Sequence, residues 1–531
     1  MYRLTTMVLD FGGKGKGALV RGKFYITTPI YYPSDRLHIG HAYTTVAADT
    51  VARFKRMEGY DVFFLTGADE HGQKIERTAK SKGKDPQSYV DEIVASFKEL
   101  WARLEISYDD FIRTTEPRHK VVAQKIFQKL YEQGDIYKST YQGWYCTPCE
   151  TFWTARQLVD GKCPDCGRPV ELLQEESYFF RLSAYADRLL AYIEEHPDFI
   201  QPPARRNEVI SFIRGGLEDL CVSRTTFSWG IPVPFDPRHV IYVWIDALTN
   251  YLSALGYGTE DDERFKRYWP ADVHLVGKDI VRFHAIIWPS ILMALGLELP
   301  RRVVGHGWLL VEGGKMSKSK GNVIDPHYLI DKYGVDAVRY YLLRELAFGA
   351  DGEYEEKNLV KRLNYDLAND LGNLLYRTLT VLEKYGEGVI GEPVEKEGPD
   401  DELIALAIST PARVAELVDQ LQLSEALAAI WQLVGRANKY LDETAPWRLG
   451  KDPGRKKRFD TVIYNVLEVY RFITVLLGPF MPGFPPRVWP QLGIASLPAL
   501  HTFESLKWGQ LPPGIRVAKG EPLFPRLELE D

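Results

Sequence analysis

The sequence predicts an α/β protein in which a doubly wound parallel sheet is interrupted by an inserted domain and followed by an α-helical bundle. Three observations lead to this fold class. A strand–helix–strand pattern opens the ordered part of the chain, short apolar runs typical of parallel strands return much later, and helical periodicity dominates after about residue 357. At about 100–200 residues per domain, the 531 residues allow three or four domains.

The first βαβ unit is predicted from three neighbouring segments. Residues 24–28 (FYITT) form a β-branched and aromatic run, and residues 61–67 (DVFFLTG) form an apolar run that ends in glycine. Between them, Ala47, Val51 and Phe54 recur at the spacing of one helical face. Because such crossovers are right-handed and join parallel strands, this segment starts a Rossmann-like sheet.

Later segments complete the predicted architecture. The runs 241–246 (IYVWID) and 273–277 (VHLVG) are expected to add parallel strands, so the sheet is interrupted by roughly 90 residues of inserted chain. From Leu363 onward, leucines repeat with helical periodicity. The Gly/Pro/Glu-rich segment 384–400 is expected to be a loop between helices, and the Pro-rich end of the chain to have little regular structure.

Composition limits the class of protein. No apolar run approaches the roughly 18 residues of a membrane helix, and residues 1–22 lack the features of a secretory signal. Five cysteines in 531 residues favour a reducing compartment, the cytoplasm. Because the net charge is −6, binding of nucleic acid requires local basic patches, for which RKKR at 455–458 is one candidate, although such a run alone is more typical of a solvated face.

Four of the cysteines are grouped. Cys146 and Cys149 form one C-x2-C, Cys163 and Cys166 form another, and thirteen residues separate the pairs. Two such turns can aim four thiolates at one point, which is the donor set of a structural zinc site with no open coordination position. Chance and a redox pair are the alternatives. Cys221 is expected to be a small buried hydrophobe.

Two further motifs suggest phosphate binding. His38-Ile39-Gly40-His41 lies between the first strand and the first helix, where free backbone N–H groups and the helix dipole favour an anion. Residues 313–322 (GGKMSKSKGN) combine mobile glycines with lysines that can contact phosphate oxygens. Either motif alone is common in chains that bind no nucleotide. Their order, around a βαβ unit and before a helical domain, is specific.

With these motifs, HIGH at 38–41 and KMSKS at 315–319, the chain resembles the class I aminoacyl-tRNA synthetases. It is most similar to the bacterial methionyl-tRNA synthetase family of the short, single-zinc-knuckle type, over residues 23–510, with support from FFLTGADEHG at 63–72. The resemblance implies these divisions: 1–22, N-terminal extension; 23–138 and 225–300, the two halves of the Rossmann-like catalytic domain; 139–224, inserted connective domain with the zinc hairpin; 301–356, KMSKS-bearing linker; 357–512, α-helical anticodon-binding domain; 513–531, tail.

The resemblance also implies the reaction. The methionine carboxylate attacks the α-phosphorus of ATP, pyrophosphate leaves, and the methionyl group passes to the 3′ end of tRNA(Met). Catalysis is then positioning and charge neutralisation, with Mg²⁺ held mainly by the phosphates. The expected catalytic residues are His38, His41, Lys315 and Lys318, and the expected ATP-binding residues are His38, Gly40, His41, Gly277, Asp279 and Lys318.

A methionine pocket needs apolar and aromatic walls around a polarisable thioether. By resemblance its residues are Ile30, Tyr32, Asp69, Trp244, Ala247, Leu248, Tyr251, Ile280 and His284. Asp69 is expected to bind the ammonium group, and Tyr32 and His284 to make the polar contact to sulfur. Family members vary at the position of Leu248.

The helical domain is expected to recognise the CAU anticodon of initiator and elongator tRNA(Met). By family position, Trp447 is the stacking platform, and Asn373 and Arg377 reach the first anticodon base. The chain shows no recognisable dimerisation appendage, so a monomer without membrane association is expected.

Two alternatives remain open from the sequence. One is another class I synthetase, or an adenylate-forming relative with a small acceptor; the other is a non-catalytic RNA-binding paralogue. The 274 positions between His41 and Lys315 leave little room for the large editing domain of the leucine, isoleucine and valine enzymes. The intact motifs together with Asp69 disfavour a non-catalytic protein.

Overall fold

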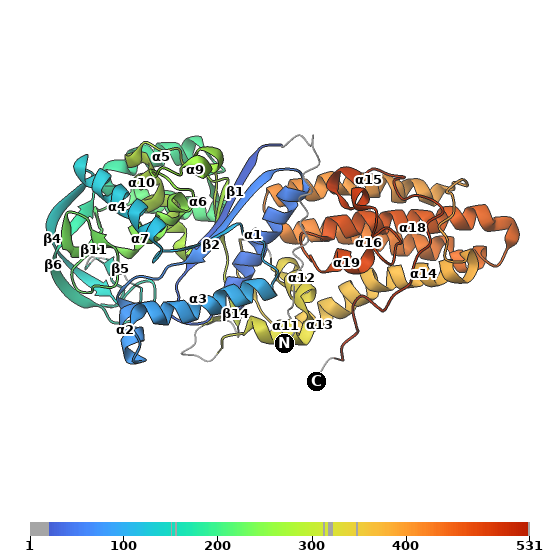
Figure 1. Ribbon diagram of the computed structural model, residues 1–531, viewed down its shortest axis with the longest axis horizontal. Helices are drawn as coiled ribbons and strands as arrows, with labels where there is room; N and C mark the ends of the chain where they lie inside the picture. The colour runs from blue at the N-terminus through green and yellow to red at the C-terminus, as the bar shows by residue number, and fades with distance from the viewer. Residues whose placement is uncertain are drawn as a thin grey trace.

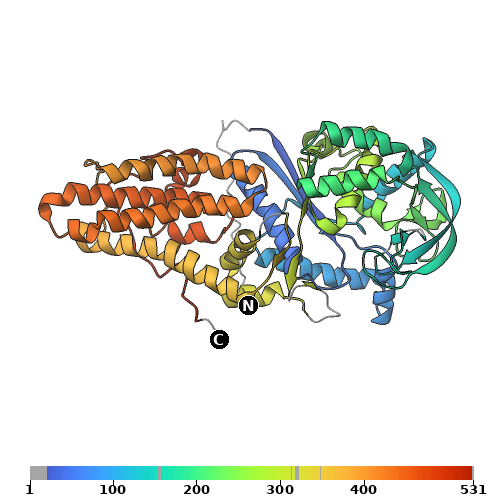
Figure 2. The same cartoon turned by 180° about the vertical axis from the view of Figure 1, so that it is seen from behind.

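The computed structural model describes residues 21–149, 151–153, 155, 157–311, 314–316, 322–346 and 349–528. It has an α/β lobe and an elongated helical lobe, joined by a small region that contains α11 (Pro326–Tyr333), α12 (Val335–Glu345) and α13 (Glu356–Arg362) (Figures 1 and 2). The predicted extension 1–22 lies outside the described residues, except for Arg21 and Gly22.

The α/β lobe is built on six strands that are all parallel, in the order β3-β2-β1-β12-β13-β7. Their bounds are β1 Lys23–Tyr31, β2 Asp61–Ala68, β3 Asp110–Arg113, β7 Ile200–Gln201, β12 Val273–Gly277 and β13 Val303–His306. The predicted Rossmann-like class is therefore confirmed. The order in which strands are added reverses between β1 and β12, although all strands remain parallel, so this pair is the topological switch point. Ligands of such sheets bind at the switch point, outside the carboxyl ends of the strands.

Helices cover both faces of the sheet. Along β1, Phe24 and Ile26 belong to the core that includes α1 (Ile39–Met57) and α3 (Pro86–Arg103), whereas Tyr25 belongs to the core that includes α4 (Pro117–Glu132) and α10 (Trp288–Leu295). Successive side chains of a strand point to opposite faces, so this alternation marks a sheet buried on both sides. The helical face predicted from Ala47, Val51 and Phe54 is buried.

The cysteine-bearing insert forms a second, antiparallel sheet in the order β5-β4-β6-β8. Its strands are β4 Ile136–Cys146, β5 Thr151–Trp153, β6 Glu171–Phe180 and β8 Leu220–Cys221. Strand β7 falls within the range 139–224 expected for the insert, yet it pairs with β13 of the main sheet. Pairing between distant segments leaves no local sequence signal, and the domain boundaries stay predictions.

The prediction of a parallel strand at 241–246 is wrong. Strand β11 (Asp236–Ile241) pairs antiparallel with β9 (Ser223–Arg224) and β10 (Pro232–Val233) in a separate small sheet. Helix α7 (Val243–Leu248) begins two residues later, and five of its six residues are buried. A short apolar run does not distinguish a buried strand from a buried helix, because both carry apolar side chains on every face.

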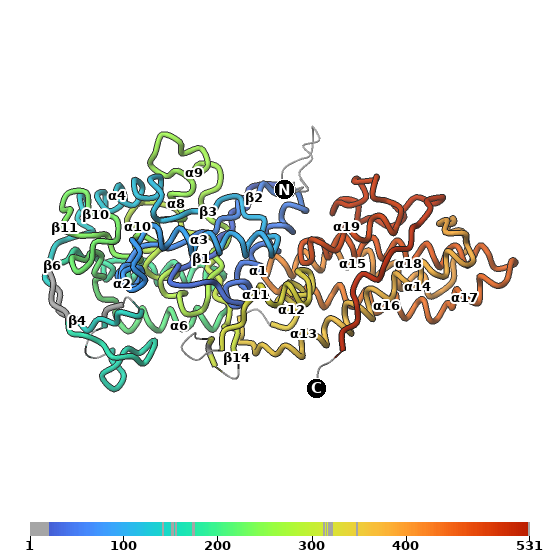
Figure 3. Tube along the Cα trace, turned by 60° about the horizontal axis from the view of Figure 1, so that its bottom comes forward, coloured from blue at the N-terminus to red at the C-terminus, as the bar shows by residue number. Residues whose placement is uncertain are grey.

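The helical lobe contains α14 Asn373–Gly386, α15 Gly398–Asp419, α16 Leu423–Thr444, α17 Pro446–Leu449, α18 Lys456–Leu477 and α19 Phe484–Val488, as predicted for this region. The end of the chain folds back along the lobe (Figure 3), where Asn364 Nδ2 donates to Leu527 O. In the basic run 455–458, Arg458 is buried and pairs with Asp400, whereas Arg455, Lys456 and Lys457 are exposed and the first two of these pair with Glu397 and Asp460. Among the described residues, no helix has the length and apolar character needed to span a membrane.

Candidate active site

A cavity of about 490 Å³ opens at the carboxyl ends of the central strands, at the switch point. Ile30 comes from the end of β1, Asp69 directly follows β2, Gly277 ends β12, and His306 ends β13. Each of these four strands therefore contributes residues at or just beyond its end to one place, where helix termini and loops rather than sheet edges form the walls.

Two histidines close the first turn of α1 at this cavity. The backbone N–H of Gly40 donates to His38 Nδ1 and the backbone N–H of His38 donates to His41 Nδ1, each over 3.1 Å, and the two rings lie 4.0 Å apart. Because both Nδ1 atoms accept hydrogen bonds, the proton of each neutral ring resides on Nε2. The start of a 19-residue helix thus carries two imidazole N–H donors in addition to its dipole.

The second signature and the segment after it lie against the first signature. A Cβ added to Gly40 would be 2.9 Å from His38 Cε1 and 3.3 Å from the methyl carbon of Met316. The N–H of Ile39 donates to Ile324 O over 3.2 Å. The two motifs, 274 positions apart, therefore share one cavity. The backbone of Lys315 ends the short strand β15 (Gly314–Lys315), and Lys318 lies outside the described residues.

The nine residues predicted for the methionine pocket all line this cavity. They are Ile30, Tyr32, Asp69, Trp244, Ala247, Leu248, Tyr251, Ile280 and His284. Helices α7 and α8 (Asn250–Ser253) supply the central four, and the Trp244 ring stacks on Phe283 with 3.5 Å between centroids and 9° between planes. This wall is aromatic and apolar, as recognition of an unbranched apolar side chain requires.

Tyr251 and His284 form a hydrogen-bonded pair in the cavity wall. His284 Nδ1 lies 3.0 Å from the carbonyl of Ile280, which can only accept, so Nδ1 carries the proton and Nε2 accepts the Tyr251 hydroxyl over 2.7 Å. Complete burial lowers the pKa of His284 to about 4 and keeps the ring neutral. Both ring nitrogens are thus engaged, and a polar contact from His284 to sulfur requires exchange of one of these bonds.

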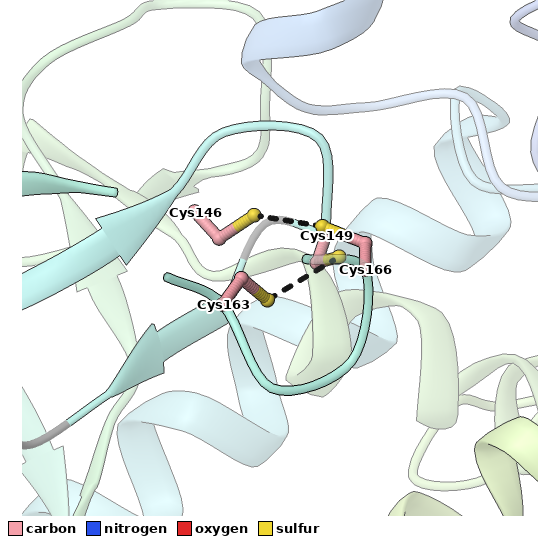
Figure 4. A group of neighbouring side chains, drawn as sticks. All are labelled: Cys146, Cys149, Cys163 and Cys166. Atoms are coloured by element: carbon pink, nitrogen blue, oxygen red, sulfur yellow. Dashed lines mark hydrogen bonds between the residues drawn. The ribbon is translucent and has the colours of Figure 1, made fainter. Parts of the chain in front are cut away.

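The four grouped cysteines converge from two turns of the insert (Figure 4). Cys146 Sγ lies 3.5 Å from Cys166 Sγ, Cys149 Sγ lies 3.9 Å from Cys163 Sγ, and all four sulfur atoms lie within 4.8 Å of one another. A tetrahedral zinc site with Zn–S bonds of ~2.3 Å has sulfurs ~3.8 Å apart, so this donor set fits the metal. Cys149 also lines the cavity, which joins the insert to the candidate active site.

Comparison with known proteins decides the family. The profile described as tRNA synthetases class I (M) matches residues 24–171 and 167–379. The methionine–tRNA ligase of Caldanaerobacter subterraneus subsp. tengcongensis is 66% identical over 507 residues, which cover 96% of this chain and 79% of that protein. This chain belongs to the methionine–tRNA ligases, a family of class I tRNA synthetases.

Other methionine–tRNA ligases give the same result. The Bacillus subtilis protein is 57% identical over 522 residues, which cover 96% of this chain and 78% of that protein. The solved structure of Mycobacterium tuberculosis methionyl-tRNA synthetase in complex with methionyl-adenylate has a TM-score of 0.92 at 45% identity, covering 95% of this chain and 100% of that chain. The resemblance inferred from the two signature motifs is confirmed.

The three residues expected to read an anticodon lie in the helical lobe of this ligase. Asn373 begins α14, and Arg377 follows one turn later. The guanidinium of Arg377 lies 5.5 Å from the centroid of the Trp447 ring and forms a 2.7 Å ion pair with Asp442. Arg377 and Trp447 are therefore brought together from α14 and α17, with both side chains partly exposed.

Several cavity residues were not predicted. His306 accepts the Thr44 hydroxyl at Nε2 over 2.7 Å, and Trp308 Nε1 donates to Asp279 Oδ1 over 3.2 Å. Lys278 Nζ lies 4.0 Å from the centroid of the Trp308 ring. The available signal was the position of His306 at the carboxyl end of a short apolar run, the same criterion that places Asp69.

Proposed function

We propose that this cavity forms methionyl-adenylate from L-methionine and ATP and then passes the methionyl group to the 3′ end of tRNA(Met), initiator and elongator alike. One observation carries the assignment of the site. Fourteen residues expected to hold methionine or ATP line a single cavity, next to Met316 of the second signature. The family determines the reaction class, and this convergence supports the role of each residue.

The first step needs no general base, because the methionine carboxylate is already ionised when it attacks the α-phosphorus. What the site supplies is orientation and compensation of charge on the phosphates. The Nε2–H groups of His38 and His41 and the start of α1 face one side of the polyphosphate, and Gly40 lets the nucleotide lie close to the backbone. By the family motif, Lys315 and Lys318 of the second signature are assigned to the leaving phosphates. Mg²⁺ bound to ATP adds positive charge at the phosphates.

Methionine binds by a charged end and an apolar end. The Asp69 carboxylate, which follows the end of β2, accepts hydrogen bonds from the ammonium group of methionine. Trp244, Ala247, Leu248 and Ile280 surround the side chain. Tyr251, whose hydroxyl proton is donated to His284, lines the same space, and Tyr32, which also lines it, is assigned the polar contact to sulfur. Shape and apolarity therefore select the substrate, with the thioether making only weak polar contacts.

The helical lobe recognises the anticodon, so tRNA selection is separated from chemistry. Trp447 offers a ring on which an unpaired base stacks, and Asn373 and Arg377 offer donors to base edges. The protein acts as a monomer. Zinc is held by Cys146, Cys149, Cys163 and Cys166 and stabilises the insert, since four protein ligands leave no open position for catalysis.

ATP–pyrophosphate exchange measured with each of the twenty amino acids tests this proposal. Exchange with methionine alone is the expected result. Exchange with a different amino acid would reassign the pocket to another class I specificity. No exchange with any amino acid would favour a non-catalytic RNA-binding protein.

A further inference from the structure

A fully buried carboxylate lies beneath the cavity wall and takes no part in the proposed chemistry. Asp246 has no solvent exposure, and each of its oxygens contacts a different imidazole. His71 Nδ1 lies 2.6 Å from Oδ2, and His119 Nε2 lies 2.7 Å from Oδ1. Burial opposes ionisation of this carboxyl, but the two histidines outweigh burial and lower its pKa to about 2.

The three residues come from three segments that are distant in the sequence. Asp246 lies in α7 between Trp244 and Ala247, which both line the cavity. His71 follows β2 two positions after Asp69, and His119 lies in the first turn of α4. The carboxylate thus connects the helix that forms the methionine wall to the segment that holds the candidate ammonium ligand, and anchors both to α4.

The protonation pattern is determined by the ionised carboxylate, which can only accept. His71 therefore donates from Nδ1 and His119 from Nε2. His119 Nδ1 lies 2.8 Å from Ser253 Oγ, which completes a Ser–His–Asp arrangement. Ser253 is only 2% exposed and is not among the residues that line the cavity, so this arrangement cannot act as a nucleophilic triad.

We propose that Asp246 is a positioning residue for methionine, holding Trp244 and Ala247 at a constant distance from Asp69. The inference rests on the proposed function of the cavity. Substrate is bound by its charged end at one segment and by its side chain at the other, so its affinity depends on the spacing between them. ATP meets α1 and the ends of β12 and β13, which Asp246 does not contact.

The segment that holds Asp69 is fixed on its other side by independent contacts. Trp229 Nε1 donates to Glu70 O over 2.6 Å, Gly72 N–H donates to Trp229 O over 3.0 Å, and Glu70 pairs with Arg113. Loss of Asp246 therefore leaves this segment attached to the protein and removes its link to α7. The expected defect is altered spacing in the amino-acid pocket, without collapse of the site.

The test compares Asp246→Ala with Asp246→Asn in ATP–pyrophosphate exchange, with KM measured separately for methionine and ATP. An asparagine keeps the geometry, because its oxygen accepts from His71 while its amide donates to His119 Nε2 and the His119 proton moves to Nδ1, facing Ser253. Asp246→Ala should raise the methionine KM about tenfold and leave the ATP KM unchanged, and Asp246→Asn should restore the methionine KM to within about threefold.

Asp272→Ala is the matched control. This carboxylate is also buried, pairs with Lys23 over 2.8 Å, and precedes β12 at the end of the sheet away from the cavity. It should lower thermal stability without a selective change in the methionine KM. His71→Ala removes the contact between Asp246 and the segment that holds Asp69, and it is expected to raise the methionine KM selectively even if Asp246→Ala does not fold.

Parallel rises in both KM values would overturn the inference, as would failure of asparagine to restore methionine binding. A selective effect of Asp272→Ala would also overturn it, since loss of any buried carboxylate would then suffice. If the unaltered chain shows no exchange with methionine, the proposed function itself fails, and this result is distinguishable because it needs no variant.

Discussion

Arg339 connects the two lobes through a single buried guanidinium, and replacing it should separate amino-acid activation from tRNA charging. The side chain has no solvent exposure. It donates to Asp49 Oδ2 over 2.7 Å and to Leu104 O over 3.0 Å in the α/β lobe, and to Pro479 O over 3.1 Å and Phe480 O over 3.0 Å in the helical lobe. Asp49 lies in α1, the helix that begins with the first signature.

The perturbation is Arg339→Met, which removes the charge and retains most of the apolar stem. Three backbone carbonyls lose a charged donor, and Asp49 keeps Arg53 at 2.8 Å and the N–H of Ser107 at 2.7 Å. Removing one partner of a buried ion pair costs about 3–5 kcal/mol. Because Arg53 and Ser107 continue to satisfy Asp49, a cost of about 3 kcal/mol, at the lower end, is expected.

Methionine-dependent ATP–pyrophosphate exchange should change less than about threefold, because no cavity residue is altered, whereas tRNA charging should fall at least about tenfold, because one buried link between the lobes is lost. Arg471→Met is the matched control. Arg471 is equally buried and pairs with Glu468 over 2.8 Å, but its contacts stay within the helical lobe. Equal charging defects in the two variants, or an exchange defect as large as the charging defect in Arg339→Met, would refute the reasoning.

Four further outcomes are expected. Gly40→Ala should reduce exchange by about tenfold or more, measured as kcat/KM for ATP, because the new methyl group meets the His38 ring at 2.9 Å. Trp447→Ala should impair tRNA charging and leave exchange nearly intact, and equal losses would contradict the separation of roles. His284 has a pKa of about 4 against 6.5 for an exposed ring, so the unfolded chain binds the extra proton first. The contribution of neutral His284 to the free energy of unfolding is then fully present above pH 6.5 and falls by about 3 kcal/mol as the pH drops to 4. Urea unfolding at both pH values should show a smaller loss in His284→Gln. Chelation of zinc should lower the thermal transition of the insert, and zinc but not magnesium should restore it.

Local sequence patterns were sufficient to predict the first two strands and the helix between them. The strands at 24–28 and 61–67 were predicted from a β-branched, aromatic run and an apolar run, and the helix between them from its period of about 3.6 residues; all three are present in the structure. The cysteine pairs and the two signatures were recognised because turns, glycines and charged residues occur at set spacings. The cavity confirms that the two signatures meet, through Gly40 and Met316.

Sequence patterns did not predict the features that depend on tertiary contacts between distant segments. The mostly apolar run 241–246 is compatible with either a buried strand or a buried helix. In the structure its residues from Val243 onward form the buried helix α7. Strand β7 has two residues and exists because β13 offers hydrogen bonds to it. Asp246, His71 and His119 are scattered over 175 positions, and single polar residues in apolar runs give no indication that they meet.

The position of the cavity explains why its parts come from so many segments. In a parallel sheet every strand ends on the same side, so each strand–helix connection adds a few residues at the switch point without disturbing the core. The insert follows this pattern, since Pro148 and Cys149 reach the cavity from the cysteine-bearing turns. A metal held by the four cysteines would then lie close to the substrate pocket without entering the chemistry, and the role proposed for Asp246 is likewise to act on the pocket without touching the substrate. We therefore expect substrate affinity in this protein to depend on residues that fix distances between segments as well as on those that touch the ligand.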